Sequence, residues 1–450
     1  MDNALWKKIS EFDFDNPMSE YGFSTRLATE NFWTIDFTQK AIVEYKKFMY
    51  LAGASDLMVS PSEIIDIVWH QHLIFTQSYS DLCNIIGKNI QHIPSTHNKE
   101  DFEKFKLAKQ RTKKLYIDTF GEQPQEIWEF SDMYEAVHLP KSQFKIRTFV
   151  IFGILSFIAL LAPLYFLLKP VYVRIDNPYF MQGYLALIVI SFVGLEMYNK
   201  SYLINIVKGF KPHTFIHQLR PFELVYLKTQ QLQNVIHGNV NPLVKEGVIG
   251  VKNDKLKLHE EASANTLEEF TIIKTLKHLG DVSYAPLLKQ LLQKPIFSMV
   301  CNSMDAFKKY FIKSKSFGKL FYLNFTLLSI VLMLGLLRLS IGILRGKSVH
   351  LIALILIVLV IVVVTFLWRL SMLVCTDTVP RFYRDEILPK REDQKNWDWQ
   401  YFLMGAVILS PSFIPMTNLR DTGSSSSDSS SSCSSGCGSS CSSCGGCGGD

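Results

Sequence analysis

The sequence predicts a mainly α-helical membrane protein with two folded helical parts outside the membrane and a low-complexity tail. Four stretches are apolar over about the 20 residues that a helix needs to cross a hydrocarbon layer ~30 Å thick. Outside them, apolar residues recur at helical spacing, and residues 422–450 are almost wholly Ser, Gly and Cys. A chain of 450 residues can bury a separate core in each folded part.

Charge and cysteine content exclude several classes of protein. The net charge is only +6, from 47 basic and 41 acidic residues dispersed along the chain, so we expect no nucleic-acid partner. The first twenty residues contain no apolar core and no small-residue cleavage site, so we expect no secretory signal peptide and a cytoplasmic N-terminus. Five of the eight cysteines crowd into the tail, which is not the pattern of a disulfide framework.

Residues 1–147 are expected to form a helical domain. The run TIDFTQKAIVEYKKFMYLAG has apolar residues at helical spacing and is expected to end at Gly53. Ser60 is expected to cap a second helix, with Pro61 in its first turn and Glu63 completing a capping box, before IIDIVWHQHLIFTQSYSDLC. Two more helices are expected in DFEKFKLAKQRTKKLYIDTF and QEIWEFSDMYEAV.

The second of these helices carries the most distinctive chemistry. Asp66 and His70 are four residues apart and share a helix face, so the carboxylate can fix the imidazole tautomer. His70 and His72 lie about 200° apart on a regular helix and cannot bind one metal ion, unlike the histidines of HExxH. Three interpretations stay open: Trp69 and His72 in the core with a structural His70–Asp66 pair, a ligand-recognition pocket, or a metal or acid–base site of Asp66, His70 and His92.

The order of these residue types resembles the glycine-rich-domain protein family. The resemblance rests on PSEIIDIVWHQHLIFTQSYSDLC, then GKNIQHIPS, then YIDTFGEQPQEIW, and covers about 75 residues. In that family a proline-led helix carries Asp, Trp-His-x-His, Tyr and Asp-x-Cys. The family usually has paired histidines before the later proline, where this chain has Gln91-His92. The resemblance implies a helical domain and assigns no catalytic role to the histidines.

Four apolar stretches are expected to cross the membrane as two helical hairpins, over 149–198 and 320–370. The spans are Phe149–Leu168, Tyr179–Tyr198, Leu320–Leu337 and Leu351–Leu370. The second contains Glu196 near its end, where the side chain can reach the interface. The loop KPVYVRIDNP predicts a tight turn, with Pro170 and Pro178 stopping the two helices.

The distribution of Lys and Arg around the spans predicts their orientation. Sixteen lie before span one, after span two, before span three and after span four, against five in the two hairpin loops. The five are Lys169, Arg174, Arg338, Arg345 and Lys347. The larger group is expected in the cytoplasm, together with residues 1–147 and 199–319, and the membrane is expected to be a bacterial inner membrane.

The central segment, residues 199–319, predicts a small winged-helix-like domain. One helix is expected to begin near Pro221, a second to cover Gln230–His237, and a third to run from Pro242 to Gly247. VIGVKNDKLKL then alternates around Asn253-Asp254, which is a hairpin signal. Two amphipathic helices are expected in EEASANTLEEFTIIKTLKHLG and SYAPLLKQLLQKPIFSMV.

This central domain is expected to bind protein rather than DNA. In the short third helix Lys245 is opposed by Glu246, and membrane helices tether the domain at both ends. The motif Arg220–Leu227, the span arrangement and the Cys/Gly/Ser-rich tail together resemble an uncharacterised family of bacterial membrane proteins, which suggests a fusion with the N-terminal domain.

The C-terminal region, residues 371–421, contains a second kind of apolar segment. Residues 401–416 are broken by Pro411 and Pro415, so a re-entrant or interfacial helix is expected rather than a fifth span. The tail, 422–450, is expected to be disordered. Its thiolates could bind a metal ion, be modified, or have no dedicated role. They belong to Cys433, Cys437, Cys441, Cys444 and Cys447.

Three classes of function remain from the sequence. A membrane-anchored scaffold or protein-interaction protein comes first, because the folded parts are helical contact-type domains. A metal-dependent or acid–base enzyme using Asp66, His70 and His92 is second, and its discriminator is whether these three side chains converge. A transport-associated component is third, because the spans contain almost no ionisable residues to line a path.

Overall fold

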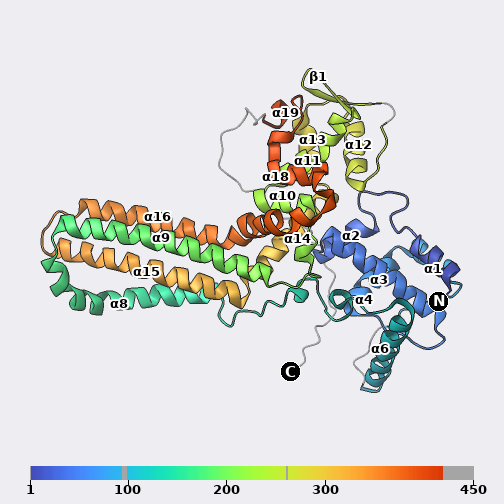
Figure 1. The fold of residues 1–450 in the computed structure, drawn as a ribbon, viewed down its shortest axis with the longest axis horizontal. Helices are drawn as coiled ribbons and strands as arrows, with labels where there is room; N and C mark the ends of the chain where they lie inside the picture. The colour runs from blue at the N-terminus through green and yellow to red at the C-terminus, as the bar shows by residue number, and fades with distance from the viewer. Residues whose placement is uncertain (1, 94–98, 260–261, 419–450) are drawn as a thin grey trace.

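The computed structural model describes residues 2–93, 99–259 and 262–418. The chain is mainly helical, and four long helices form an extended bundle with both folded parts gathered at one of its ends (Figure 1). The predicted disordered tail and its five cysteines lie outside the described residues.

The N-terminal domain is built from short and medium helices, as predicted, but their boundaries differ. Its elements are α1 (Asn3–Ser10), α2 (Phe23–Asn31), α3 (Ile35–Ala54), α4 (Glu63–Ile74), α5 (Thr76–Ile86), α6 (Lys99–Phe120), α7 (Gln125–Trp128) and a 3₁₀ turn at Glu135–Val137. The predicted single helix after the proline is two helices, because the chain leaves helical geometry at Phe75, whose ring packs on Phe23. The N-cap of α4 is Ser62, not Ser60, and its hydroxyl accepts the Ile65 N–H.

Gly53 does not end its helix. It lies inside α3, which continues to Ala54. A Cβ at Gly53 would come within 2.3 Å of Cγ2 of Ile86. The glycine therefore permits a close approach of α3 to the end of α5, which is a tertiary requirement rather than a capping one.

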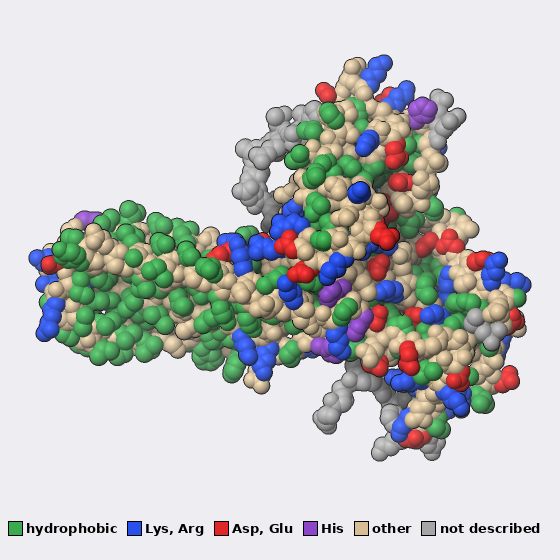
Figure 2. All heavy atoms as spheres, in the orientation of Figure 1, with side chains coloured by type: hydrophobic (Ala, Val, Ile, Leu, Met, Phe, Trp, Pro, Cys, Tyr) green, Lys and Arg blue, Asp and Glu red, His purple; other side chains and the backbone are tan. Residues whose placement is uncertain are grey.

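Four helices are long and apolar enough to cross a membrane, and each contains one predicted span. They are α8 (Ile146–Arg174), α9 (Asn177–Lys208), α15 (Lys315–Leu344) and α16 (His350–Leu373), whose helical run continues to Lys390. Both hairpin loops lie at the same end of the bundle (Figure 1). Hydrophobic side chains cover most of the visible bundle surface, while Lys and Arg gather at its tip and at its junction with the folded parts (Figure 2). This distribution suits a lipid environment.

One detail of the first hairpin differs from the prediction. Pro170 does not stop α8, which runs through it to Arg174. The turn is therefore only Ile175 and Asp176, and Pro178 occupies the first turn of α9, where a missing N–H costs nothing.

α15 is the central helix of the bundle and packs on α8, α9 and α16. Asn199 of α9 and Asn324 of α15, both fully buried, exchange amide hydrogen bonds of 2.9 and 2.8 Å. Further along α15, a Cβ at Gly335 would meet the Tyr184 hydroxyl at 2.2 Å, so glycine is needed for helix contact there. The bundle thus has a specific register, fixed by one polar pair and one close approach.

The central domain contains helices and the two-stranded sheet of the described residues. Its elements are a 3₁₀ turn at Phe215–His217, α10 (Pro221–Thr229), α11 (Leu232–Lys245), β1 (Ile249–Lys252), β2 (Lys255–Leu258), α12 (Leu267–Leu279), α13 (Tyr284–Leu291) and α14 (Pro295–Ile312). The hairpin is confirmed: Gly250 pairs with Lys257, and Asn253 and Asp254 have φ of 50° and 58°, as a type I′ turn requires. The segment predicted to form the last amphipathic helix instead forms two helices, α13 and α14.

Two helices, not three, precede the hairpin. α11 continues through Pro242, which was expected to start a separate helix. A proline inside a helix leaves the carbonyl four residues earlier without its N–H partner. That carbonyl belongs to Gly238, and it accepts a 3.0 Å hydrogen bond from Nε1 of Trp397 instead. The helix can therefore continue through Pro242, because a donor 159 residues away satisfies the carbonyl that the proline leaves unpaired.

The chain after α16 returns to the central domain. It forms the π-helical segments Val374–Thr378 and Tyr383–Ile387 around α17 (Val379–Phe382), 3₁₀ turns at Leu388–Lys390, Glu392–Lys395 and Gly405–Ile408, and helices α18 (Trp397–Met404) and α19 (Ile414–Asn418). Tyr401 and Phe413 are buried, and Phe413 packs edge-on against Tyr284 of α13. Four residues of 401–416, namely Tyr401, Phe402, Leu409 and Phe413, therefore belong to a protein core, unlike the re-entrant or interfacial helix that was expected, while Met404 and Val407 stay exposed.

The N-terminal domain is docked onto the central domain by polar contacts. The Tyr134 hydroxyl donates to the backbone oxygens of Phe32 (2.6 Å) and Ser303 (3.1 Å). Lys294 at the start of α14 forms a 2.7 Å ion pair with Glu20. The two folded parts thus share one interface beside the bundle.

Candidate functional site

Asp66 and His70 lie on one face of α4, as their spacing predicts. Oδ2 of Asp66 is 3.8 Å from Nδ1 of His70. This distance allows an attraction to a protonated imidazole but is too long for a hydrogen bond. The cap fixes where α4 begins, because the Ser62 hydroxyl also donates to the Ile127 carbonyl at 2.7 Å. The positions of both side chains follow from this start.

His92 reaches the same place from the loop after α5. That helix ends at Gly87, whose φ of 77° turns the chain. Nε2 of His92 lies 2.8 Å from Oδ1 of Asp66, which is hydrogen-bond distance. The ring packs edge-on against Trp69 at 4.6 Å and lies 4.4 Å from the His70 ring, measured between centroids.

A short hydrogen-bond chain holds this loop. Nε1 of Trp69 donates to the Tyr79 hydroxyl at 3.1 Å, and that hydroxyl donates to the backbone oxygen of Ile90. Burial raises the pKa of Tyr79 to about 12, so the phenol stays protonated as a donor at neutral pH. Trp69 and Tyr79, two residues of the family-like motif, therefore position His92.

Asp66, His70 and His92 offer ligand atoms that all lie within 4.8 Å of one another. The side chains are 37%, 58% and 15% exposed, respectively, so a small ligand can reach them. Two imidazoles and one carboxylate form a donor set that suits zinc and other divalent transition metals and leaves coordination positions open. Without a metal, the Asp66–His92 pair holds one imidazole in a defined tautomer, as acid–base chemistry requires.

His72 has a different role from His70. Its ring is fully buried, with Nδ1 2.9 Å from the Tyr45 hydroxyl and Nε2 3.1 Å from the Ser78 hydroxyl. Burial lowers the pKa of His72 to about 4, so the ring stays neutral. His72 and the buried Trp69 are therefore core residues, whereas His70 lies with Asp66 and His92.

Glu44 is a buried polar residue that the sequence reasoning missed. Its carboxylate accepts hydrogen bonds from the Tyr116 hydroxyl (2.7 Å), Nε1 of Trp128 (2.9 Å) and Nζ of Lys47 (2.8 Å). Burial, helped by Glu44, raises the pKa of Tyr116. Glu44 thus ties α3 to α6 and α7. The available signal was an acidic residue on the apolar face of a predicted helix.

A groove of about 1040 Å³ was also missed, and it lies between the first helices and α5. Its floor is a series of packed rings, with centroid distances of 5.1 Å for Phe12–Phe14, 4.7 Å for Phe14–Phe23 and 5.6 Å for Phe23–Phe75. Five charged residues line it, namely Lys8, Glu11, Asp13, Asp15 and Asp81. The groove is therefore aromatic below and acidic at its edge.

Comparison with known proteins gives a partial similarity. Glycine-rich domain-containing protein 2 of Arabidopsis thaliana is 31% identical over 91 residues, which are 19% of this chain and 12% of that protein. Glycine-rich domain-containing protein 1 of Arabidopsis thaliana is 28% identical over 91 residues, 19% of this chain and 11% of that protein. The chain thus spans about an eighth of the length of these relatives. No family model and no solved structure matches the chain.

Proposed function

We propose that this protein is a membrane-anchored interaction protein whose N-terminal domain docks a basic segment of a partner protein. The observation that carries the proposal is the groove with its aromatic floor and acidic edge. Four carboxylates against one lysine favour a cationic partner, and the ring of Tyr21, which lines the groove and is 42% exposed, provides apolar contact area. Ile74, which is 55% exposed, adds an apolar anchor at the same edge.

The proposed layout places both folded parts in the cytoplasm of a bacterium, with a glycine-rich-type domain joined to a bacterial-type membrane anchor. Support comes from the excess of Lys and Arg on one side of the spans. Both hairpin loops lie at the opposite end of the bundle, which supports a layout with the two folded parts on one side of the membrane. The hairpin-bearing central domain, of winged-helix type, is a second surface for protein contacts.

Peptide binding tests this function directly. Full-length protein in detergent is titrated with a labelled amphipathic Lys/Leu peptide and with its Glu/Leu counterpart, and fluorescence anisotropy reports binding. We expect the Lys/Leu peptide alone to bind, and the variant Glu11→Gln/Asp81→Asn to weaken it about five-fold or more, as loss of two rim charges implies. The matched control is Asp118→Asn/Glu122→Gln, which removes two exposed acids outside the groove. Equal binding of both peptides, or equal weakening by both variants, would overturn the proposal.

A metal-dependent or acid–base enzyme is the second candidate function. It is favoured by the convergence of Asp66, His70 and His92, which come from one helix and a distant loop. A bound metal would leave open positions for water or substrate, and the three side chains would hold it at the domain surface. In this assignment the two functions use different residues of one domain.

A further inference from the structure

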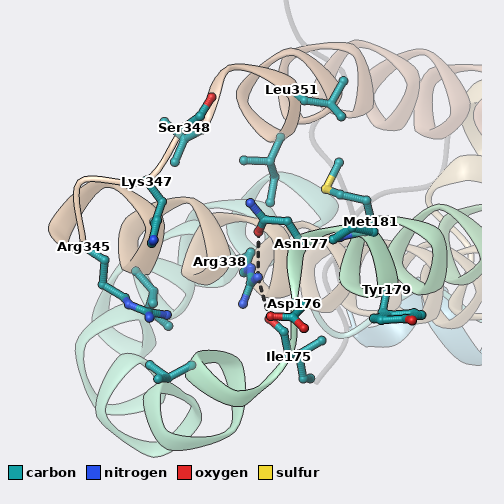
Figure 3. Close-up of a pocket in the computed structure, with 16 residues that line it drawn as sticks. Ile175, Asp176, Asn177, Tyr179, Met181, Arg338, Arg345, Lys347, Ser348 and Leu351 are labelled. Carbon is teal, nitrogen blue, oxygen red and sulfur yellow. Dashed lines mark hydrogen bonds between the residues drawn. The ribbon is translucent and has the colours of Figure 1, made fainter.

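A cavity of about 560 Å³ lies at the loop end of the bundle, far from the folded parts. All four long helices or their loops line it, through residues such as Val173, Met181, Arg338 and Ile352 (Figure 3). Its volume is in the range of ligand-binding pockets, ~300–1,000 Å³. Its position is where the headgroups of a bilayer would meet the helices.

Cations dominate this cavity. Arg338, Arg345 and Lys347 line it against one carboxylate, that of Asp176. These are three of the five basic residues Lys169, Arg174, Arg338, Arg345 and Lys347 that lie in or near the two hairpin turns. The exposed side chains of Arg345 and Lys347 have no hydrogen-bond or ion-pair partner among the residues that the structure describes. An anion in the cavity would supply the missing partner.

Arg338 is held in place rather than free. It donates to the backbone oxygen of Ile175 at 2.9 Å and to Oδ1 of Asn177 at 2.7 Å (Figure 3). It also donates to the backbone oxygen of Tyr172. Its guanidinium also lies 4.8 Å from the centre of the Phe180 ring. A guanidinium with its direction fixed in this way is a preorganised positive charge in the wall of the cavity.

Two helix N-termini also open at this cavity. α9 follows Asp176 and α16 follows Val349, and neither N-cap side chain accepts a hydrogen bond from the helix. The first-turn N–H groups and the positive ends of both helix dipoles therefore add to the field of the three cations. This combination of fixed charge, uncapped N–H groups and available volume favours a phosphate-sized anion.

We propose that this cavity binds the phosphate of an anionic membrane lipid. Ile341, Ile352 and Met181 line its apolar side, and a lipid presents its acyl chains next to its phosphate. The acyl chains would lie along α16, where Leu351, Leu354 and Val358 are more than half exposed. A free inorganic phosphate has no apolar part that could be buried against this surface.

The test uses full-length protein purified in mild detergent, with native mass spectrometry to count bound phospholipid. The protein is titrated with phosphatidylglycerol and, in parallel, with phosphatidylcholine. We expect phosphatidylglycerol to bind at least ten-fold more tightly. The variant Arg345→Gln/Lys347→Gln should lose most of this preference, because each nearby cation contributes to anion binding. If this variant cannot be purified, the single variant Lys347→Gln tests the proposal, and its preference for phosphatidylglycerol is expected to fall about three-fold.

The control is Lys169→Gln/Arg174→Gln, which removes two cations at the end of α8 that do not line the cavity. It should keep the wild-type preference. The proposal fails if both double variants lose the preference equally, since attraction would then be a general effect of charge. It also fails if inorganic phosphate at millimolar concentration displaces the lipid, because the site would then be one for a free anion.

Discussion

Glu223 joins the two folded parts, because its carboxylate accepts the backbone N–H of Ile35 at 3.3 Å from the N-terminal domain. Its other oxygen accepts the N–H of Arg220, the N-cap residue of α10, at 2.7 Å. The side chain is almost fully buried, and burial raises its pKa to about 7, against the lowering effect of the two backbone donors.

The first prediction is a pH-dependent stability that Glu223 causes. Its folded pKa lies above the ordinary 4.5, so its contribution is fully present below pH 4.5 and is lost as the pH rises through about 7. We expect the free energy of unfolding to fall by up to about 3 kcal/mol from pH 4.5 to 8 through this group. Thermal unfolding in detergent, followed by tryptophan fluorescence, measures it.

Comparison with Glu223→Gln isolates this effect. The buried His72 and His237 have pKa values lowered to about 4, and they act in the opposite direction, losing stability as the pH falls below 6.5. They are present in both proteins and cancel in the difference. The control is Glu246→Gln at an exposed position, which should keep the wild-type dependence of the unfolding free energy on pH. An unchanged slope in Glu223→Gln would contradict the prediction.

The second prediction concerns metal binding at Asp66, His70 and His92. With the five tail cysteines changed to Ser, we expect one zinc ion to bind per chain in a calorimetric titration. Asp66→Asn or His92→Asn should each weaken it at least ten-fold, because each removes a ligand. The exposed His278→Gln is the control. Wild-type zinc affinity in the His92→Asn variant would remove the metal site from consideration.

The third prediction concerns Glu44 in the core of the N-terminal domain. Glu44→Gln keeps the shape but presents an amide N–H₂ to groups that are themselves donors. We expect a loss of roughly 2–3 kcal/mol, the cost of leaving buried polar groups unsatisfied. Denaturant unfolding monitored by tryptophan fluorescence measures it. The exposed Glu129→Gln should change stability by less than about 0.5 kcal/mol.

The fourth prediction concerns the Asn199–Asn324 pair in the bundle. Changing either residue to Leu leaves the other amide buried without its partner, whereas changing both removes the requirement. A double-mutant cycle should give a coupling of roughly 1 kcal/mol, as measured for hydrogen bonds between membrane helices. Unfolding in mixed detergent and sodium dodecyl sulfate is the measurement. Strictly additive effects would show that the pair does not act as a unit.

The four spans were predictable because their signal is local. Hydropathy over about 20 residues depends on no distant partner, and the same holds for the Asn253-Asp254 turn. The shared face of Asp66 and His70 also follows from helical spacing alone. The proximity of His92 could be suspected from the motif, but its distance could not, since it depends on Gly87 and on the Tyr79 hydrogen bond to Ile90.

Three of the wrong predictions depended on a contact distant in sequence. From the sequence, Pro242 predicts the start of a helix. The structure shows that the helix passes through it, because Trp397 donates to the Gly238 carbonyl. From the sequence, Gly53 predicts the end of a helix. In the structure its role is to leave room for the side chain of Ile86. The apolar run at 401–416 reads as a membrane segment because hydrophobicity does not distinguish a lipid from a protein core, and only the buried contact of Phe413 with Tyr284 decides.

The hydrogen bond from Trp397 to Gly238 also sets an order of assembly during synthesis. The central domain begins before the second membrane hairpin in the chain and is completed by α18 and α19, which follow it. While the ribosome is still making α15 and α16, the core around Tyr284 lacks Phe413, and the Gly238 carbonyl lacks its donor. We therefore expect the central domain to reach its final packing only after the last span has been inserted. A fully folded central domain would then show that all four spans have been made.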